Sequence, residues 1–313
     1  NLVKFVQVEY KKIDIDDIEI FKQIVGVDFV FIDEEKLLEF SHDETEDLSF
    51  LPDVVVKPKN TIEVSRLLEY CNNWKIPITA CGARTGLSGG SIPIYGGVSL
   101  SLERFDSIIE IDERNLQATV EPGVINQNFR DAVKRKGLFY PPDPSSKGSC
   151  QLGGNLAENA GGPRAVKYGV TKDYVLNLEV VLPSGDVIWT GANVLKNATG
   201  YDLTALMIGS EGTLGVITEV QLKLSPIPEN MMSAVCQFPD LKSAVLTAQE
   251  IIQFGTSIAR IELLNKDQME ISIKYSNLEN LEALPTLFYE FHGSESSNKE
   301  SIEVVDEISK SHG

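Results

Sequence analysis

The stretch Cys81-Gly82-Ala83-Arg84-Thr85-Gly86-Leu87-Ser88-Gly89-Gly90 carries the strongest signal in this chain. It follows Pro77-Ile78-Thr79-Ala80, a short run that predicts a strand. Glycine reaches positive φ and lets the backbone approach a ligand closely, so this loop can curl with its N–H groups directed inward. Such a concavity predicts a pyrophosphate site, with the hydroxyls of Thr85 and Ser88 as additional donors.

Two better-known phosphate-binding loops do not fit this stretch. A P-loop ends in Gly-Lys-Ser/Thr, and residues 81–90 contain no lysine. The dinucleotide turn of a Rossmann fold needs GxGxxG, and the glycines here are spaced differently. Taken alone, the loop also fits a plain glycine turn between two strands.

Three further loops have the same character: YPPDPSS at residues 140–146, GGNLAENAGGP at 153–163 and GSEGTLGVI at 209–217. The prolines of the first fix an extended ledge that bears Asp143. The second predicts a short helix with the amides of Asn155 and Asn159 one turn apart. The third is a glycine turn that opens into a strand. Each alone fits a turn, but four such loops on one scaffold predict a large ligand.

The remaining pattern predicts two domains after a weakly patterned segment, residues 1–50. A helix is predicted over 61–74 with Thr61 as its N-cap, followed by strands that alternate with the glycine loops. Pro226 and Pro228 mark a boundary, so we assign 51–228 to a ligand-binding domain. Residues 229–313 alternate between strand and helix and predict the start of an α+β domain, incomplete at its end.

Composition excludes several classes of function. The net charge of −18 and the pI of about 4.6 repel phosphate backbones, so no nucleic-acid partner is expected. No apolar run is long enough to span a bilayer. The cysteines are scattered, which argues against a disulfide framework and a structural zinc site and favours a cytoplasmic protein: Cys71, Cys81, Cys150 and Cys236. The chain begins at Asn1 and stops directly after a helical pattern, so we expect it to be part of a longer protein.

In order, the motifs CGARTGLSGG, PPDPSS, GGNLAENAGGP, KYGVT and TGYDLTALMIGSEGTLGVITE resemble the FAD-linked oxidases of the vanillyl-alcohol oxidase type. Within that superfamily the chain is most similar to the group of the glycolate oxidase flavin subunit, D-lactate dehydrogenase and D-2-hydroxyglutarate dehydrogenase. The resemblance is dense over residues 52–226 and weaker beyond. It implies an α+β fold: a two-lobed, PCMH-type FAD-binding domain followed by the start of a ferredoxin-like cap domain.

The resemblance also assigns cofactor-binding roles, which we carry over only to matching positions. These comprise the pyrophosphate loop, the proline-aspartate ledge, the glycine-asparagine helix start and the adenine-side strand start: Gly82, Ala83, Arg84, Thr85, Gly86, Leu87, Ser88, Gly89; Pro142, Asp143, Ser146; Gly153, Gly154, Asn155, Asn159, Gly162; Gly212, Val216 and Ile217. Arg84 stands where the family has a smaller residue. The histidines His42, His292 and His312 all lie outside the flavin loops, so non-covalent FAD is expected.

The resemblance implies a dehydrogenase that oxidises a small 2-hydroxy acid, such as D-lactate, glycolate or D-2-hydroxyglutarate. Its electron acceptor would be a quinone, an electron-transfer protein or an iron-sulfur subunit. The base and the metal-binding histidines of the lactate-type relatives lie further towards the C-terminus, so we assign no catalytic residue and no metal ligand. Arg164 suits a substrate carboxylate, but a surface or FAD-phosphate contact fits it better.

Two alternatives remain open at this point. One is a non-catalytic FAD-binding or assembly subunit, and the other is a different flavin oxidase or reductase of the superfamily. A homodimer and a peripheral contact with the inner face of the membrane are also compatible with the sequence.

Overall fold

The computed structural model describes residues 9–313. Contacts between Cα atoms divide the chain into two compact units. Of the described residues, unit 1 comprises 9–140, 145–160 and 171–225, and unit 2 comprises 141–144, 161–170 and 226–313. Two short stretches of the middle of the sequence therefore group with the C-terminal part. The assignment of domains to 51–228 and 229–313 stays a prediction.

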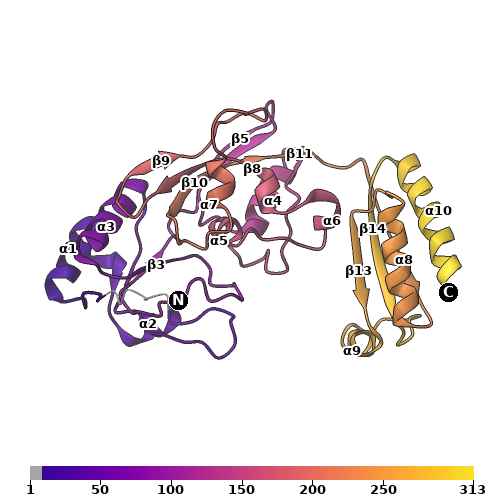
Figure 1. The fold of residues 1–313 in the computed structure, drawn as a ribbon, viewed down its shortest axis with the longest axis horizontal. Helices are drawn as coiled ribbons and strands as arrows, with labels where there is room; N and C mark the ends of the chain where they lie inside the picture. The colour runs from indigo at the N-terminus through magenta and orange to yellow at the C-terminus, as the bar shows by residue number, and fades with distance from the viewer. Residues whose placement is uncertain (1–8) are drawn as a thin grey trace, which may run out of the picture. The chain divides into compact units, whose positions relative to one another are not determined.

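A mixed four-stranded sheet forms the first part of unit 1 (Figure 1). Its order is β1-β2-β4-β3, with β1 antiparallel to β2 and the other pairs parallel. The strands are β1 (Val30–Phe31), β2 (Val54–Val56), β3 (Ile78–Cys81) and β4 (Val98–Ser101). Valines of β2 lie in one apolar core with residues of α1 (Ile15–Val25) and α3 (Thr61–Trp74). The helix α3 has its predicted bounds, but its N-cap is Asn60, whose side chain accepts from the Glu63 N–H, and not Thr61.

An antiparallel five-stranded sheet forms the second part of unit 1, in the order β5-β6-β10-β8-β9. Its strands are β5 (Ile108–Asp112), β6 (Gln117–Val120), β8 (Val175–Val181), β9 (Val187–Trp189) and β10 (Val216–Lys223). From Thr218 on, the central strand β10 is buried at alternate positions, as a strand packed on one face requires, whereas its first three residues are all buried.

Short elements connect these sheets. They are η1 (Val27–Phe29), α2 (Glu34–Glu39), α4 (Asn126–Lys134), β7 (Leu138–Phe139), α5 (Leu152–Ala157), α6 (Ala165–Tyr168), η2 (Thr171–Tyr174), α7 (Leu203–Met207) and β11 (Ser225–Pro226). Of these, α6 belongs to unit 2.

Unit 2 is built on a three-stranded sheet in the order β12-β14-β13. The strands are β12 (Asn230–Gln237), β13 (Arg260–Leu264) and β14 (Thr286–Gly293), with β14 antiparallel to both neighbours. The helices are α8 (Leu241–Gln253), α9 (Lys266–Ser276) and α10 (Glu295–His312). In Figure 1, α8 and α10 lie along the sheet, and their apolar residues share its core. The strand β14 is thus inserted between two parallel strands joined by α8, a split βαβ unit.

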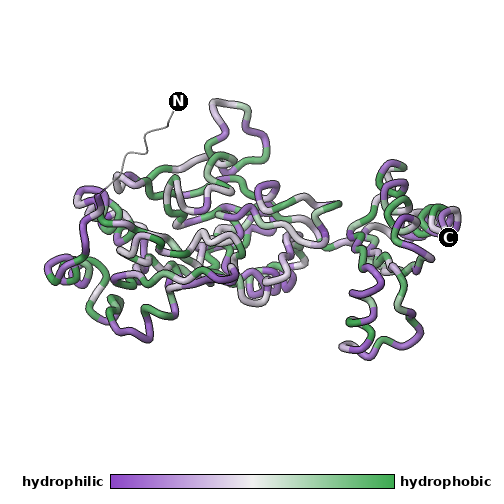
Figure 2. Tube along the Cα trace, turned by 60° about the horizontal axis from the view of Figure 1, so that its bottom comes forward, coloured by the Kyte–Doolittle hydropathy of each residue, from purple (hydrophilic) through white to green (hydrophobic). Residues whose placement is uncertain are grey.

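Hydrophilic and hydrophobic residues alternate along the helices of both units (Figure 2). Among the helices of residues 9–313, none combines the length and the apolar character that a membrane span requires. All four cysteines are free.

Candidate flavin and substrate site

The glycine loop leaves the end of β3 with two residues at positive φ, Arg84 at 56° and Gly89 at 76°. Gly82 packs against Gln151, because a Cβ at this glycine would lie 2.9 Å from the Gln151 Oε1. The loop is partly exposed, and the Leu87 side chain is 77% exposed. A backbone of this form presents N–H groups rather than side chains to a ligand.

The loop meets two of the other predicted segments within unit 1. The Ser88 hydroxyl donates to both carboxylate oxygens of Glu158, at 2.9 and 3.0 Å, directly after α5. The turn of residues 209–213 is bonded to the same helix, with the Gly209 N–H donating to the Leu156 carbonyl at 3.0 Å. The structure thus brings together three of the four loops that the sequence singled out.

Buried amides of α5 and its N-cap suit a polar ligand. The Nδ2 of Asn155 and the Oε1 of Gln151 are buried and have no hydrogen-bond partner among the described residues. Unpaired buried amide atoms cost free energy unless a ligand or water satisfies them. Because Gln151 also contacts the glycine loop, these two atoms fit a large polar group held there.

Asn159 departs from the prediction for this helix. The helix α5 ends at Ala157, and Asn159 adopts a positive φ of 50°. Its Oδ1 accepts from the Lys172 N–H at 3.0 Å. The prediction that Asn155 and Asn159 lie one helical turn apart is therefore wrong, because the helix ends at Ala157, before the left-handed Asn159. At the fourth segment, Val216 and Ile217 bury their side chains, so only their backbone atoms are available to a ligand.

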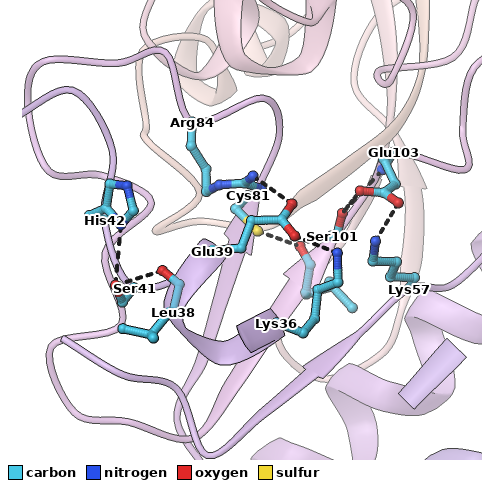
Figure 3. Close-up of polar contacts among 11 residues, drawn as sticks. Lys36, Leu38, Glu39, Ser41, His42, Lys57, Cys81, Arg84, Ser101 and Glu103 are labelled. Carbon is cyan, nitrogen blue, oxygen red and sulfur yellow. Dashed lines mark hydrogen bonds and ion pairs between the residues drawn. The ribbon is translucent and has the colours of Figure 1, made fainter. Parts of the chain in front are cut away.

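The Arg84 side chain points towards Glu39 of the same unit (Figure 3). Its guanidinium carbon lies 4.0 Å from the centroid of the Phe40 ring, and its Nη2 lies 3.1 Å from the Glu39 Oε1. Both partners belong to the end of α2. The side chain therefore connects the glycine loop to α2. This contact is the role of an arginine at a position where the family has a smaller residue.

The proline ledge is divided between the two units. Residues 141–144 belong to unit 2, whereas Ser145 and Ser146 belong to unit 1. Asp143 is buried, and Gly162 packs against it so closely that a Cβ there would lie 2.6 Å from the Asp143 carbonyl oxygen. Only glycine permits this approach without displacing the backbone.

Arg164 pairs with two carboxylates of unit 2. Its Nε and Nη2 donate to the Glu290 Oε1 at 3.0 and 2.6 Å, and its Nη1 lies 3.6 Å from the Asp143 Oδ2. The guanidinium of Arg164 is therefore paired with protein carboxylates, whereas the sequence had suggested a substrate carboxylate as one possible partner. The partner Glu290 carries no signal in the sequence that would reveal this role.

His292 lies in the same cluster on β14, with a side chain that is 1% exposed. Its Nε2 lies 2.5 Å from the Glu290 Oε1, and its Nδ1 lies 2.7 Å from the Tyr168 hydroxyl oxygen. Burial lowers the pKa of His292 below its ordinary value and outweighs the opposing effect of Glu290. A neutral ring then donates from Nε2 to the carboxylate, and Nδ1 accepts from the Tyr168 O–H.

Comparison with known protein families decides the identity. Residues 52–191 match the family model of an FAD binding domain, and residues 227–313 match that of the FAD linked oxidases' C-terminal domain. The chain belongs to the FAD-linked oxidase family. FAD as the cofactor, predicted from the glycine loops and the resemblance, is confirmed by these matches.

Two relatives illustrate the similarity of this FAD-linked oxidase to characterised groups. It is 42% identical over 278 residues to "Glycolate oxidase subunit GlcD" of Bacillus subtilis, covering 87% of this chain and 58% of the relative. It is 40% identical over 296 residues to "Probable D-lactate dehydrogenase, mitochondrial" of Danio rerio, covering 94% and 59%. The chain thus spans less than two thirds of the length of these relatives.

Solved structures show the fold of this FAD-linked oxidase. Alkyldihydroxyacetonephosphate synthase matches with a TM-score of 0.84 at 20% identity, covering 98% of this chain and 61% of that one. A p-cresol methylhydroxylase with substrate bound matches with 0.78 at 19% identity, covering 95% and 64%. The predicted α+β, PCMH-type fold is confirmed. Within residues 9–313, no group of three or more metal-binding side chains suits an ion.

Proposed function

We propose that this FAD-linked oxidase is the flavin-binding part of a dehydrogenase that converts a small 2-hydroxy acid into the 2-oxo acid. The observation that carries the proposal is the convergence of the glycine loop, α5 and the turn 209–213 in unit 1. The printed names of the relatives, with glycolate and D-lactate, support the substrate class. D-2-hydroxyglutarate is a third candidate of the same chemistry.

The residues of unit 1 would hold the pyrophosphate through backbone N–H groups of Gly82–Gly89. The Asn155 Nδ2, which has no hydrogen-bond partner among the described residues, would add a side-chain donor. Bound FAD would supply the acceptor for the hydride that leaves Cα of the substrate. The residues Pro142, Asp143, Ser146 and Gly162 stay predicted flavin contacts.

Non-covalent binding of FAD is part of the proposal. Burial raises the pKa of Cys81 to about 12 and also raises that of Cys150, so neither thiol is a reactive thiolate. His292 has both ring nitrogens engaged by Glu290 and Tyr168. These side chains are poor nucleophiles for attachment to the flavin.

We assign no catalytic base and no metal ligand among residues 9–313, and the electron acceptor stays open among a quinone, an electron-transfer protein and an iron-sulfur subunit. The expected cytoplasmic location, with or without peripheral contact to the membrane, stays a prediction, as does a homodimer.

The test is the visible absorption spectrum of the purified full-length gene product before and after anaerobic addition of D-lactate, glycolate or D-2-hydroxyglutarate. Flavin bands that bleach with one acid support the proposal and name the substrate. Bands that no acid bleaches overturn the dehydrogenase and leave the FAD-binding subunit or another oxidase of the family. Absence of flavin after addition of FAD overturns the cofactor site as well.

A matched pair of variants ties the flavin to the glycine loop. Gly82→Leu places a side chain against Gln151 and should yield protein without flavin bands. Gly148→Ala adds a Cβ with nothing within 4 Å and should retain them.

A further inference from the structure

A fully buried asparagine stands at the start of α4, at a position that an apolar side chain would fill. The buried residues of this helix are Asn126, Phe129 and Val133, which recur at helical spacing on the face turned into unit 1. Phe129 packs against the Tyr140 ring, with the ring centroids 5.0 Å apart. Asn126 is therefore the polar member of an otherwise apolar helix face.

Asn126 does not cap the helix, which is the ordinary role of asparagine at a helix start. The N-cap of α4 is Ile125, and no side chain caps this end. Both amide atoms of Asn126, Oδ1 and Nδ2, are buried and have no hydrogen-bond partner among residues 9–313. An unpaired buried amide destabilises a protein, so neither capping nor packing accounts for this residue.

The backbone places Asn126 beside two residues whose amides also have unpaired atoms. The preceding residue, Ile125, forms an antiparallel bridge with Gln151, and the Asn155 N–H donates to the Gln151 carbonyl at 3.1 Å. The Gln151 side chain in turn contacts Gly82. Three buried amides of unit 1 thus lie on adjoining backbone segments next to the start of the glycine loop.

The chemistry of Asn126 excludes the pyrophosphate as its partner. An ionised phosphate offers only acceptors, and it would leave the Oδ1 of Asn126 unpaired. Either orientation of this amide presents one donor group and one acceptor. Its complement is therefore an uncharged edge with a donor next to an acceptor, of the kind that asparagine recognises on nucleobases.

FAD has two such edges, one on the pyrimidine ring of the flavin and one on the adenine. The adenine is predicted beside the strand start at Gly212 and Val216. Asn126 is connected to a different segment, because its N–H donates to the Cys150 carbonyl at 3.0 Å and the Cys150 N–H donates to the Ser146 carbonyl at 2.8 Å. Ser146 is a predicted flavin contact, so this connection favours the flavin edge.

We propose that Asn126 is a cofactor-binding residue whose carboxamide pairs with N3–H and an adjacent carbonyl of the flavin pyrimidine ring. The choice of ring rests on the flavin contact of Ser146 in the proposed function, and the identity of the substrate does not enter. A pair of hydrogen bonds at this edge fixes the orientation of the ring in its own plane.

The experiment titrates deflavinated full-length protein with FAD and with 3-methyl-FAD, in which a methyl group replaces the N3 hydrogen. Quenching of flavin fluorescence gives a Kd for each. The wild type should bind 3-methyl-FAD about tenfold to a hundredfold more weakly than FAD, the loss expected for two hydrogen bonds. Asn126→Leu should weaken binding of FAD by a similar factor and should no longer distinguish the two flavins.

Two further measurements separate a flavin contact from a structural role. Because the Asn126 amide has no partner within the described residues, the urea midpoint of Asn126→Leu apoprotein should not fall below that of the wild type. Asn126→Ala repeats the titration with a smaller side chain and should lose the same discrimination. Asn128→Leu, at an exposed position of the same helix, should leave both Kd values unchanged.

Three outcomes overturn the assignment. An FAD Kd that is unchanged in Asn126→Leu and Asn126→Ala would show that the amide binds only internal water. Equal binding of the two flavins by the wild type would show that N3–H has no partner in the protein. Variants that weaken both flavins by the same factor would assign Asn126 to another part of FAD or to the fold. No substrate is present in the titration, so a protein whose flavin no 2-hydroxy acid bleaches still gives a clear result.

Discussion

The glycine-loop region of unit 1 and the α6–β14 cluster of unit 2 differ in the groups from which they are built. The first is made of backbone, with glycines, a left-handed arginine and two unpaired amide atoms. The second is made of side chains, with Arg164, Glu290, His292 and Tyr168 joined by successive hydrogen bonds. A backbone site depends on conformation, whereas a side-chain cluster depends on partners that are distant in sequence.

This difference predicts different responses to substitution. In unit 1, a change should act on binding of FAD more than on folding. In unit 2, a change should act on folding and on pH dependence.

Gly162→Ala should have the largest effect. Its Cβ would lie 2.6 Å from the Asp143 carbonyl oxygen and 2.7 Å from the carbonyl carbon, so backbone must move. We expect the free energy of unfolding to fall by about 3 kcal/mol, measured by urea denaturation. Gly154→Ala, with nothing within 4 Å of its Cβ, is the control and should not destabilise. Equal stability of the two variants would contradict the packing described for Asp143.

Glu290→Gln should follow. The substitution removes the charge that faces Arg164 and His292, and we expect a loss of about 2 kcal/mol in the free energy of unfolding, because both side chains of the pair are largely buried. The same measurement on Glu295→Gln, in an exposed pair with Lys299, should show about 0.3 kcal/mol. A loss at Glu290 no larger than at Glu295 would show that the cluster does not contribute to stability.

The pH dependence of unit 2 should follow His292. Burial lowers its folded-state pKa below the ordinary value of 6.5, so the unfolded chain binds the proton more readily. The stabilisation is present above 6.5 and is lost as the pH falls from 6.5 through the folded pKa, with a slope of at most about 1.4 kcal/mol per pH unit. Unfolding curves of His292→Gln between pH 7 and 5, about the range where histidine titrates, should lack this slope. A slope that persists in the variant would assign it to another group.

The lowered pKa of Glu290 acts in a separate, more acidic window. Burial opposes ionisation of Glu290, but hydrogen bonds from His292 and Arg164 outweigh it. Its contribution is present above the ordinary value of 4.5 and is lost as the pH falls through the lowered folded pKa.

Arg84→Ala should have the smallest effect and should act on the flavin. Loss of the contact with Phe40 and of the pair with Glu39 frees the glycine loop, at about 1 kcal/mol, so the Kd for FAD should rise about fivefold in a fluorescence titration. Arg66→Ala, on the exposed face of α3, provides the control. An unchanged Kd would show that the loop keeps its form without Arg84.

Much of the fold was predictable, since local patterns decide it. The helix α3 has its predicted bounds, and the α+β pattern after Pro228 predicted β12 to β14 with α8 between two of them. The errors are also local. Asn60 rather than Thr61 caps α3, because Asn and Thr are both favourable N-cap residues and stand next to each other here. Asn159 lies outside α5, because asparagine readily adopts the left-handed conformation that ends a helix.

The sequence by itself determined the glycine loop as a phosphate-binding turn, because glycine readily adopts conformations that other residues avoid. The order of its motifs determined FAD as the ligand through their resemblance to a known family. The sequence did not determine what Arg84, Arg164 and His292 do. Tertiary structure decided that Arg84 turns back to α2 and that Arg164 is neutralised by Glu290, 126 residues away. The physical reason is that the role of a charged side chain depends on the residues that it contacts. Those residues are distant in sequence and meet it only in the folded chain.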